Sequence, residues 1–445
     1  MSQIKGADRV NVWTTGLIIA VIVSSTVATS VHEADAQAAP VTVRAAVDAA
    51  LSQHPSVAAA QQALAAAQAR LAQAQAGQNI HVALSAGSSY GNAVSTGGVI
   101  TTGPASTSSS AAVTASLQIV NEQIRYQVRQ AEAAVASAQA ALGQAQQSTG
   151  LTAAQAYFTV LRTQAVVTTR QAAVAQAEAQ VRQAQAQVRA GIAARADVLQ
   201  AQASLAAAQV DLIAARNQVE TALAGLRAAM GLRLTDEVNV APPAAPPVVP
   251  LSREQALAGA SDRPEVAGAH ANVAGAQAAL ALAEVQARPL LTVATSSSYY
   301  VWKDPAPSSN DVVWSIGATV TYSLLDGGQA QAAVAEARAN LAGAQAKEVL
   351  ALQSAQVDAV NAWLSLQDAL ARVNATRASE TAATEALRAA EGRYQAGVGT
   401  IVEVLTARTA FQSASLSRIQ AEFDVQSAVV QLRYTIGRPV VGAER

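Results

Sequence analysis

The chain uses one turn twice. It reads Arg189-Ala-Gly-Ile-Ala-Ala-Arg-Ala-Asp197-Val-Leu199 in its first half and Gln395-Ala-Gly-Val-Gly-Thr-Ile-Val-Glu403-Val-Leu405 in its second half. The central glycines, Gly191 and Gly397, are separated by 397 − 191 = 206 residues, and the acids that follow them keep the same separation. Such a constant offset indicates two copies of one helical hairpin. The turns therefore predict a duplicated unit that works through its shape.

Alanine dominates the composition. The 445 residues are 51% hydrophobic but only 3% aromatic, and alanine is the strongest helix former. These numbers favour long, closely packed helices over a compact globular core. The chain has no cysteine, which excludes disulfides, thiolate metal sites and a lipid-modified N-terminal cysteine. Its formal net charge of −1 gives no indication of nucleic-acid binding.

Residues 1–36 have the pattern of a signal peptide for export. Two basic residues precede an apolar run over residues 16–27, and Ala34-Asp35-Ala36 fits a small-x-small cleavage site. The run is too short to span a bilayer comfortably. We therefore expect an exported protein that is not a lipoprotein. Because nothing after this segment resembles a transmembrane helix, any membrane passage would have to be made by strands.

The rest of the chain divides into two repeats. The first is expected over residues 37–240 and the second over residues 251–445, joined by a proline-rich linker over residues 241–250. Each repeat is predicted to contain a helix, two strands, a very long helix and a return helix. The expected fold is therefore mainly α with a small β part.

Proline breaks and a seven-residue repeat define the helices. The first helices are predicted over residues 43–76 and 251–288, each interrupted by a proline near its start. The first long helix is predicted over residues 121–190, about 100 Å at 1.5 Å per residue. Its apolar residues and those of the return helix indicate a coiled-coil seam, formed by Val160, Val167, Val174, Val181 and Val188, then Val198, Leu205, Leu212, Val219 and Leu226.

Strict alternation of apolar and polar residues predicts the strands. It is clear from Ile80 to Gly87, from Val113 to Ile119 and from Trp314 to Leu324. The segment from Leu290 to Val301 is more ambiguous because its apolar residues lie at its two ends. The intervening stretches, residues 91–110 and 303–310, are rich in Gly, Ser, Pro or Asn and are predicted to be loops.

Four strands of about ten residues with one apolar face suit an outer-membrane barrel. Four strands leave two bare edges, which lipid forbids, so several copies must share one barrel. Two copies give eight strands and a filled interior, whereas three copies give twelve strands and an open lumen. Six aromatic residues fit an interfacial girdle, with surface aromatics on a soluble sheet as the alternative: Tyr90, Tyr299, Tyr300, Trp302, Trp314 and Tyr322.

The two turns, together with Leu324-Leu-Asp326-Gly-Gly328 between a strand and a long helix, resemble the TolC family of outer-membrane efflux and secretion conduits. The resemblance covers nearly the whole mature chain. It implies a homotrimer in which a twelve-stranded β-barrel in the outer membrane continues as a twelve-helix α-barrel across the periplasm. It also implies docking on a periplasmic adaptor and an inner-membrane pump, either proton-driven or of the ABC type.

The resemblance further implies a periplasmic gate at the turns. Asp197 and Tyr394 match gate positions, while Glu403 replaces an aspartate that lines the constriction. A basic gate position falls on Gly399, and Arg195 is the candidate substitute. The two acids would form a ring of six carboxylates in a trimer, disfavouring full ionisation and attracting cations. The alternative is that each acid stabilises the start of its return helix.

The turn residues are candidates for docking the adaptor, although packing of the turn itself is an alternative for the apolar ones. The glycines serve backbone geometry first. The candidate set is Gly191, Ile192, Val198, Leu199, Gly397, Val398, Val404 and Leu405.

The remaining polar residues indicate no enzyme. His54, His81 and His270 are scattered, and neither a metal-binding cluster nor a nucleophile motif is present, so no cofactor is expected. A periplasmic adaptor or scaffold with long coiled-coil hairpins, or a secreted coiled-coil protein, are the competing functions. The sequence does not decide between small-molecule efflux and type I secretion of polypeptides.

Overall fold

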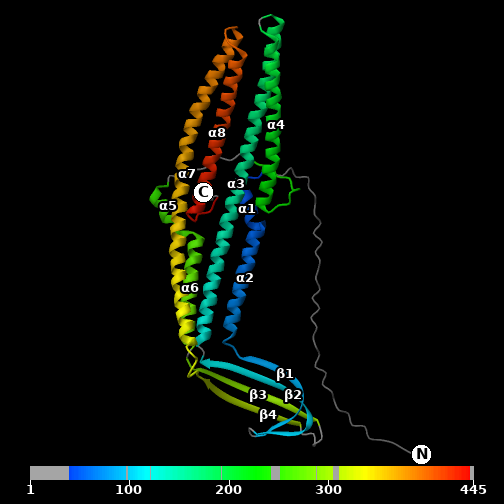
Figure 1. The fold of residues 1–445 in the computed structure, drawn as a ribbon, viewed down its shortest axis with the longest axis vertical. Coiled ribbons are helices and arrows are strands. Elements are labelled where there is room, and N and C mark those ends of the chain that lie inside the picture. The colour runs from blue at the N-terminus through cyan, green and yellow to red at the C-terminus, as the bar shows by residue number, and fades with distance from the viewer. Residues whose placement is uncertain are drawn as a thin grey trace, which may run out of the picture. The chain divides into compact units, whose positions relative to one another are not determined.

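The computed structural model describes residues 40–96, 99–120, 122–191, 193–241, 251–286, 288–303 and 310–440 (Figure 1). The predicted signal peptide lies outside the described residues, as does the linker apart from Ala241.

Both halves contain helices, two strands, a very long helix and a return helix, in the predicted order. In the first half these are α1 (Val43–Gln53), α2 (Pro55–Ala76), β1 (His81–Thr96), β2 (Val99–Val120), α3 (Glu122–Arg189) and α4 (Arg195–Met230). The second half contains α5 (Arg253–Gly259), the 3-10 turn η1 (Ala260–Asp262), α6 (Pro264–Val285), β3 (Leu290–Lys303), β4 (Asn310–Thr321), α7 (Gln329–Gln395) and α8 (Ile401–Thr435).

Proline fixes the same break in both halves. Pro55 and Pro264 each occupy the first turn of a helix, where their missing N–H costs no intrahelical hydrogen bond. The residues before them, His54 and Arg263, are extended, with ψ of 130° and 140°. A proline disfavours helical geometry in the preceding residue, so each helix must end there and restart.

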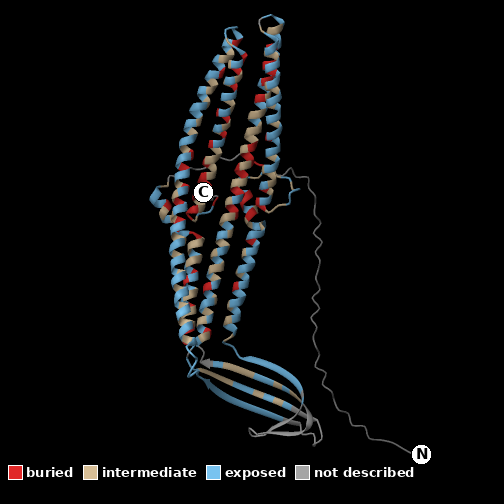
Figure 2. Ribbon diagram, viewed as in Figure 1, coloured by how far each residue is buried: buried red, intermediate tan, exposed pale blue. Residues whose placement is uncertain are grey.

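The four strands form one antiparallel sheet in the order β1-β2-β3-β4. Leu84 lies opposite Val113, which lies opposite Ser297, and Ser297 lies opposite Trp314. This register places the predicted apolar positions of β1, β2 and β4 on one face, together with Val293 and Tyr299 of β3, because side chains alternate between faces. Many apolar residues of that face, including Leu84, Trp314 and Ile316, are exposed in the single chain, and others in the middle strands are half-buried. Figure 2 accordingly shows the sheet in pale blue and tan.

The predicted loop over residues 91–110 is wrong. β1 continues to Thr96 and β2 begins at Val99, so the two strands have 16 and 22 residues instead of about ten. Pairing continues through a register shift between Gly91 and Ala93. The segment contains Val, Ile and many Thr residues, whose branched side chains suit a strand, and this outweighs its glycines and serines. The ambiguous fourth segment is the 14-residue strand β3, and residues 304–309 lie outside the described residues.

The long helices pack as two hairpins, α3 with α4 and α7 with α8, and α3 also packs against α6 and α8. The predicted heptad residues of the first hairpin are all buried or half-buried, with Val160 and Leu226 fully buried. The seam predicted from the sequence is therefore confirmed.

α4 contradicts the expectation that nothing after the signal peptide resembles a transmembrane helix. Among the described helices it alone is long and apolar enough to cross a membrane, with a mean hydropathy of 1.2 over 18 residues. The cause is its content of alanine, valine and leucine. Since its heptad residues pack along α3, length and composition do not distinguish it from an ordinary coiled-coil helix.

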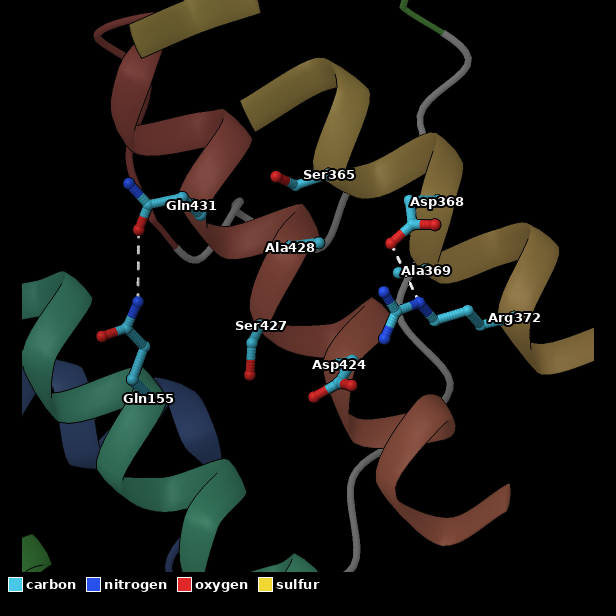
Figure 3. A pocket seen from close by; sticks show the side chains of 9 residues that line it. All are labelled: Gln155, Ser365, Asp368, Ala369, Arg372, Asp424, Ser427, Ala428 and Gln431. Carbon is cyan, nitrogen blue, oxygen red and sulfur yellow. Dashed lines mark hydrogen bonds and ion pairs between the residues drawn. The ribbon is translucent and has the colours of Figure 1, made fainter. Parts of the chain in front are cut away.

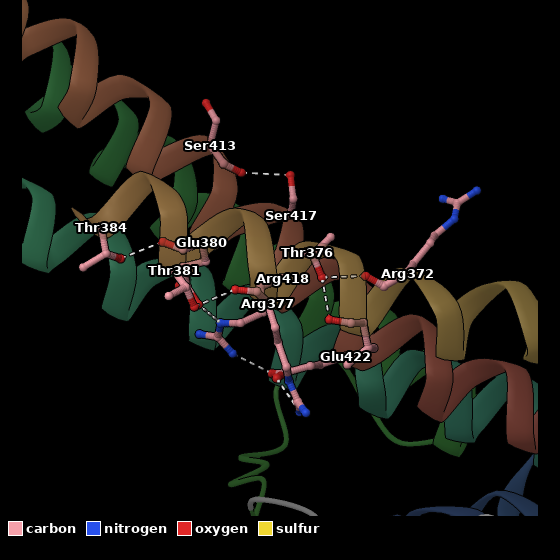
Figure 4. Close-up of polar contacts among 11 residues, drawn as sticks. Arg372, Thr376, Arg377, Glu380, Thr381, Thr384, Ser413, Ser417, Arg418 and Glu422 are labelled. Atoms are coloured by element: carbon pink, nitrogen blue, oxygen red, sulfur yellow. Dashed lines mark hydrogen bonds and ion pairs between the residues drawn. The ribbon is translucent and has the colours of Figure 1, made fainter. Parts of the chain in front are cut away.

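The seam of the second hairpin contains an ion pair. Counting 206 residues from Val174 and Leu212 leads to Glu380 and Arg418, whose Oε2 and Nε atoms are 2.6 Å apart (Figure 4). Arg418 also contacts Glu422 at 2.8 Å. Both side chains of the Glu380–Arg418 pair are mostly buried. An ion pair among apolar seam residues favours one register of the two helices over others.

Replacing Arg418 with leucine should leave Glu380 mostly buried and without its main partner. We expect Arg418→Leu to lower the free energy of unfolding by about 1–3 kcal/mol. Adding Glu380→Val should recover most of this loss, because the pair then matches the apolar seam of the first hairpin. Denaturation in detergent, followed by the helical circular dichroism signal, measures both effects. Asp368→Ala, in the exposed Asp368–Arg372 pair, is the control that should change little.

Candidate gate at the helical turns

Glycine makes both turns possible. Gly191 and Gly397 each adopt a φ of 75°, a left-handed conformation that other residues rarely adopt. An added Cβ would meet no atom within 4 Å at either glycine, so backbone conformation alone selects them. In the second turn, the N–H groups of Val398 and Gly399 both donate to the carbonyl oxygen of Arg393 at 3.0 Å. The predicted role of these glycines in backbone geometry is consistent with the structure.

The two turns pack together within one chain. A cluster of buried residues joins α3, α4, α7 and α8, and partly buried Val198, Leu205, Ala390 and Leu405 pack against it. Its members are Val181, Ala184, Ala201, Tyr394, Ile401 and Val404. The ends of both hairpins are therefore held in contact by apolar burial.

This cluster divides the predicted docking residues. Val404 is 0% exposed, so the prediction that it lies on a docking surface is wrong, because its side chain fills the interior of the cluster. Val198 and Leu405 are half-buried. Leu199 and Val398 are 59% and 73% exposed. Val402, which was not among the predicted docking residues, is 60% exposed. Ile192 lies outside the described residues.

Tyr394 and Asp197 are electrostatic neighbours. Tyr394 is only 5% exposed, and burial, with the negative charge of Asp197 as a second cause, raises the pKa of its hydroxyl above the usual value. That hydroxyl has no hydrogen-bond partner among the described residues. The predicted gate pair thus lies together, but in this structure the two side chains interact through the field of the carboxylate.

The two gate acids occupy equivalent places. Asp197 and Glu403 are each the third residue of a return helix, α4 and α8. A carboxylate in the first turn is stabilised by the helix dipole. At the start of α8, the Thr400 hydroxyl caps the helix by accepting a hydrogen bond from the N–H of Glu403 at 3.3 Å. This placement is consistent with the alternative that each acid stabilises the start of its return helix. Both side chains nevertheless lie at the turns, where the candidate gate is.

Arg393, and not the candidate Arg195, is the arginine that pairs with Glu403. Nη2 of Arg393 donates to Oε2 of Glu403 at 2.6 Å. Arg195 is exposed and makes no ion pair within the described part of the chain. Arg393 was missed because its partner is ten residues away, across a turn whose path the sequence does not reveal.

A second missed residue, Arg408, ties three helices together. It is 5% exposed and donates to Glu391 on α7 at 2.8 Å and to Gln180 on α3 at 3.4 Å. Nε of Arg408 and Nε2 of Gln180 have no partner in the described structure. The sequence contains no signal for Arg408: it lies seven residues after Ile401, but Ser415 and Glu422 continue that series, and the matching position in the first half is Gln202.

A polar cavity of about 330 Å³ lies farther along the helices, between α3, α7 and α8 (Figure 3). Gln155 donates to Gln431 across it at 3.2 Å, and Arg372 pairs with Asp368 at its edge at 2.9 Å. Its nine lining residues include two serines but neither histidine nor cysteine. Its two aspartates are already engaged, Asp368 with Arg372 and Asp424 with Gln420, so the cavity is better understood as a polar contact between the two hairpins.

Comparison with known proteins decides the family. The outer membrane efflux protein model matches residues 46–232 and residues 254–438. The chain belongs to the outer membrane efflux protein family. Membership makes this efflux protein an outer-membrane exit duct and confirms the resemblance inferred from the turns. The two matched stretches also correspond to the two halves that carry the duplicated turn.

Two solved structures of similar fold are outer-membrane channels. The outer-membrane channel OprN has 22% identity and a TM-score of 0.79, with 89% of each chain covered. The Campylobacter jejuni CmeC outer membrane channel has 16% identity and a TM-score of 0.77, with 89% of this chain and 85% of that chain covered. Nodulation protein T of Rhizobium leguminosarum bv. viciae is 25% identical over 175 residues, 39% of this chain. The match spans only 36% of that relative's length.

Removing Arg408 should loosen the turns of this efflux protein. Arg408→Met leaves Glu391 and Gln180 without their shared donor, and we expect a loss of about 1–3 kcal/mol, moderated because Glu391 is partly exposed. Arg408→Met combined with Glu391→Gln should be more stable than Arg408→Met alone, because no unpaired charge remains. Urea unfolding and the rate of limited proteolysis at the turns measure the change. Equal stability of the single variant and the wild type would contradict a structural role for Arg408.

Proposed function

We propose that three copies of the chain form one passive export duct, with a twelve-stranded barrel in the outer membrane and a twelve-helix tunnel across the periplasm. The observation that carries the proposal is the sheet. Its apolar face is exposed, with Trp314 and Ile316 at 73% and 70%, and β1 and β4 are its edges. Lipid suits the apolar face, but the edges must pair with strands of other copies.

The aromatic girdle is proposed in a reduced form. Tyr90, Tyr299 and Trp314 occupy the apolar face by the strand register, and Tyr322 is exposed just beyond β4. Tyr300 and Trp302 occupy strand positions of the opposite face. The structure describes their backbone but not the surroundings of their side chains. Alternation along β3 therefore leaves four of the six aromatics as candidates for contact with lipid.

The turns are proposed as the closed periplasmic entrance. The buried Arg408 contacts and the apolar cluster at the turns support this role, since they hold the ends of both hairpins together. Residues 1–36 would direct export and be removed, leaving a protein without a lipid anchor. The duct itself performs no reaction, so the energy for transport comes from an inner-membrane pump coupled through a periplasmic adaptor.

Purification and bilayer recording test the duct. We expect the mature protein to be extracted from outer membranes by detergent as a trimer and to conduct ions in planar bilayers. A trimer is expected because the free edges of β1 and β4 pair only between copies. A stable, water-soluble monomer that passes no ions would overturn the proposal.

Charge at the exposed turn residues should impair docking on the adaptor. Leu199→Glu and Val398→Glu place carboxylates on the apolar surface that an adaptor hairpin would cover, so the affinity for the adaptor should fall by about tenfold or more. Export assays in cells and binding to the purified adaptor measure the effect. Conductance of the same variants in bilayers is the control and should be retained. Unchanged adaptor binding would place the docking surface elsewhere.

A further inference from the structure

The second turn leaves little room for a side chain at Gly399. A Cβ added there would lie 3.0 Å from the Cβ of Arg393 and 3.1 Å from both the carbonyl carbon of Arg393 and the nitrogen of Tyr394. Two of these three atoms belong to the backbone, which cannot move aside without changing the turn. Any side chain at Gly399, a basic one included, would require the turn to shift by a few tenths of an ångström, so packing in this conformation disfavours it.

Arg393 takes over the positive charge from the other side of the same turn. Its carbonyl oxygen accepts from the N–H groups of Val398 and Gly399, while its guanidinium contacts Glu403 at 2.6 Å. The following residue, Tyr394, is buried in the cluster that joins the turns. Backbone hydrogen bonds and an adjacent buried anchor thus fix the start of the Arg393 side chain, which is 59% exposed.

The two gate acids consequently differ in charge environment. Glu403 has a guanidinium within 2.6 Å, whereas Asp197 makes no ion pair within the described residues and has the neutral Tyr394 as its electrostatic neighbour. The positions are equivalent by the 206-residue offset, so the sequence suggested two equal acids. Among the described residues, only Glu403 has a positive partner.

We propose that Arg393 neutralises Glu403 at the tunnel mouth and leaves Asp197 as the acid that sets the preference for cations. The inference rests on the proposed trimeric duct. In place of the expected ring of six equal carboxylates, the trimer would then have three Glu403 carboxylates neutralised by Arg393 and three Asp197 carboxylates without a positive partner. Fixed charge at a narrow mouth controls which ions enter, so Arg393 acts as a selectivity-determining residue.

The experiment records the reversal potential of the purified full-length mature protein in planar bilayers under a KCl gradient. Arg393→Gln should raise the K⁺/Cl⁻ permeability ratio by about twofold or more, because it releases the charge of Glu403. Adding Glu403→Gln should return the ratio to the wild-type value. Glu403→Gln alone should shift the ratio toward Cl⁻, and Asp197→Asn should lower it in every background.

Arg388→Gln is the matched control. It removes the same charge from the same helix, in the exposed Arg388–Glu385 pair at 2.6 Å, and should leave the ratio near the wild-type value. The inference is overturned if Arg393→Gln and Arg388→Gln give the same ratio, or if Glu403→Gln alone causes no shift. The proposed duct fails separately, if the wild-type protein does not conduct at all.

Discussion

The unpaired edges of the β1–β4 sheet constrain everything else in this protein. A strand edge exposes N–H and carbonyl groups that water can satisfy but hydrocarbon cannot. The exposed apolar face of the sheet suits lipid, and the two edges then require strands from other copies. In the proposed duct, strand pairing thereby sets the number of chains. The number of chains in turn sets how many long helices form the tunnel. In the proposed duct, the candidate gate residues would act only within this arrangement.

Much of the fold could be predicted because its signals are local. Pro55 and Pro264 break their helices through steric effects on the preceding residue, and the positive φ of Gly191 and Gly397 marks both turns. The long β1–β2 hairpin was not predictable in the same way. Its serines, threonines and glycines are common in loops, and only pairing with a neighbouring strand makes them a sheet.

The candidate gate could be predicted only in part. Asp197, Tyr394 and Glu403 were found through a motif, but their partners were not. Arg408 bonds to Gln180 across 228 residues of sequence, and Arg393 reaches Glu403 across a turn. Such pairs depend on how hairpins pack, which a repeat pattern does not specify. The burial of Val404 was missed for the same reason, since turn residues of both hairpins cover it.

The contact between α3 and α6 joins the first half of the chain to the second half of the same polypeptide. In the proposed duct, six contacts join neighbouring repeats around the ring. Three of them lie within a chain, where the repeats are covalently connected, and only three must form between separate chains. A ring of six separate hairpin units would lose far more translational and rotational freedom on forming. The duplicated chain consequently assembles at lower protein concentration, which suits a component that is delivered to its membrane one molecule at a time.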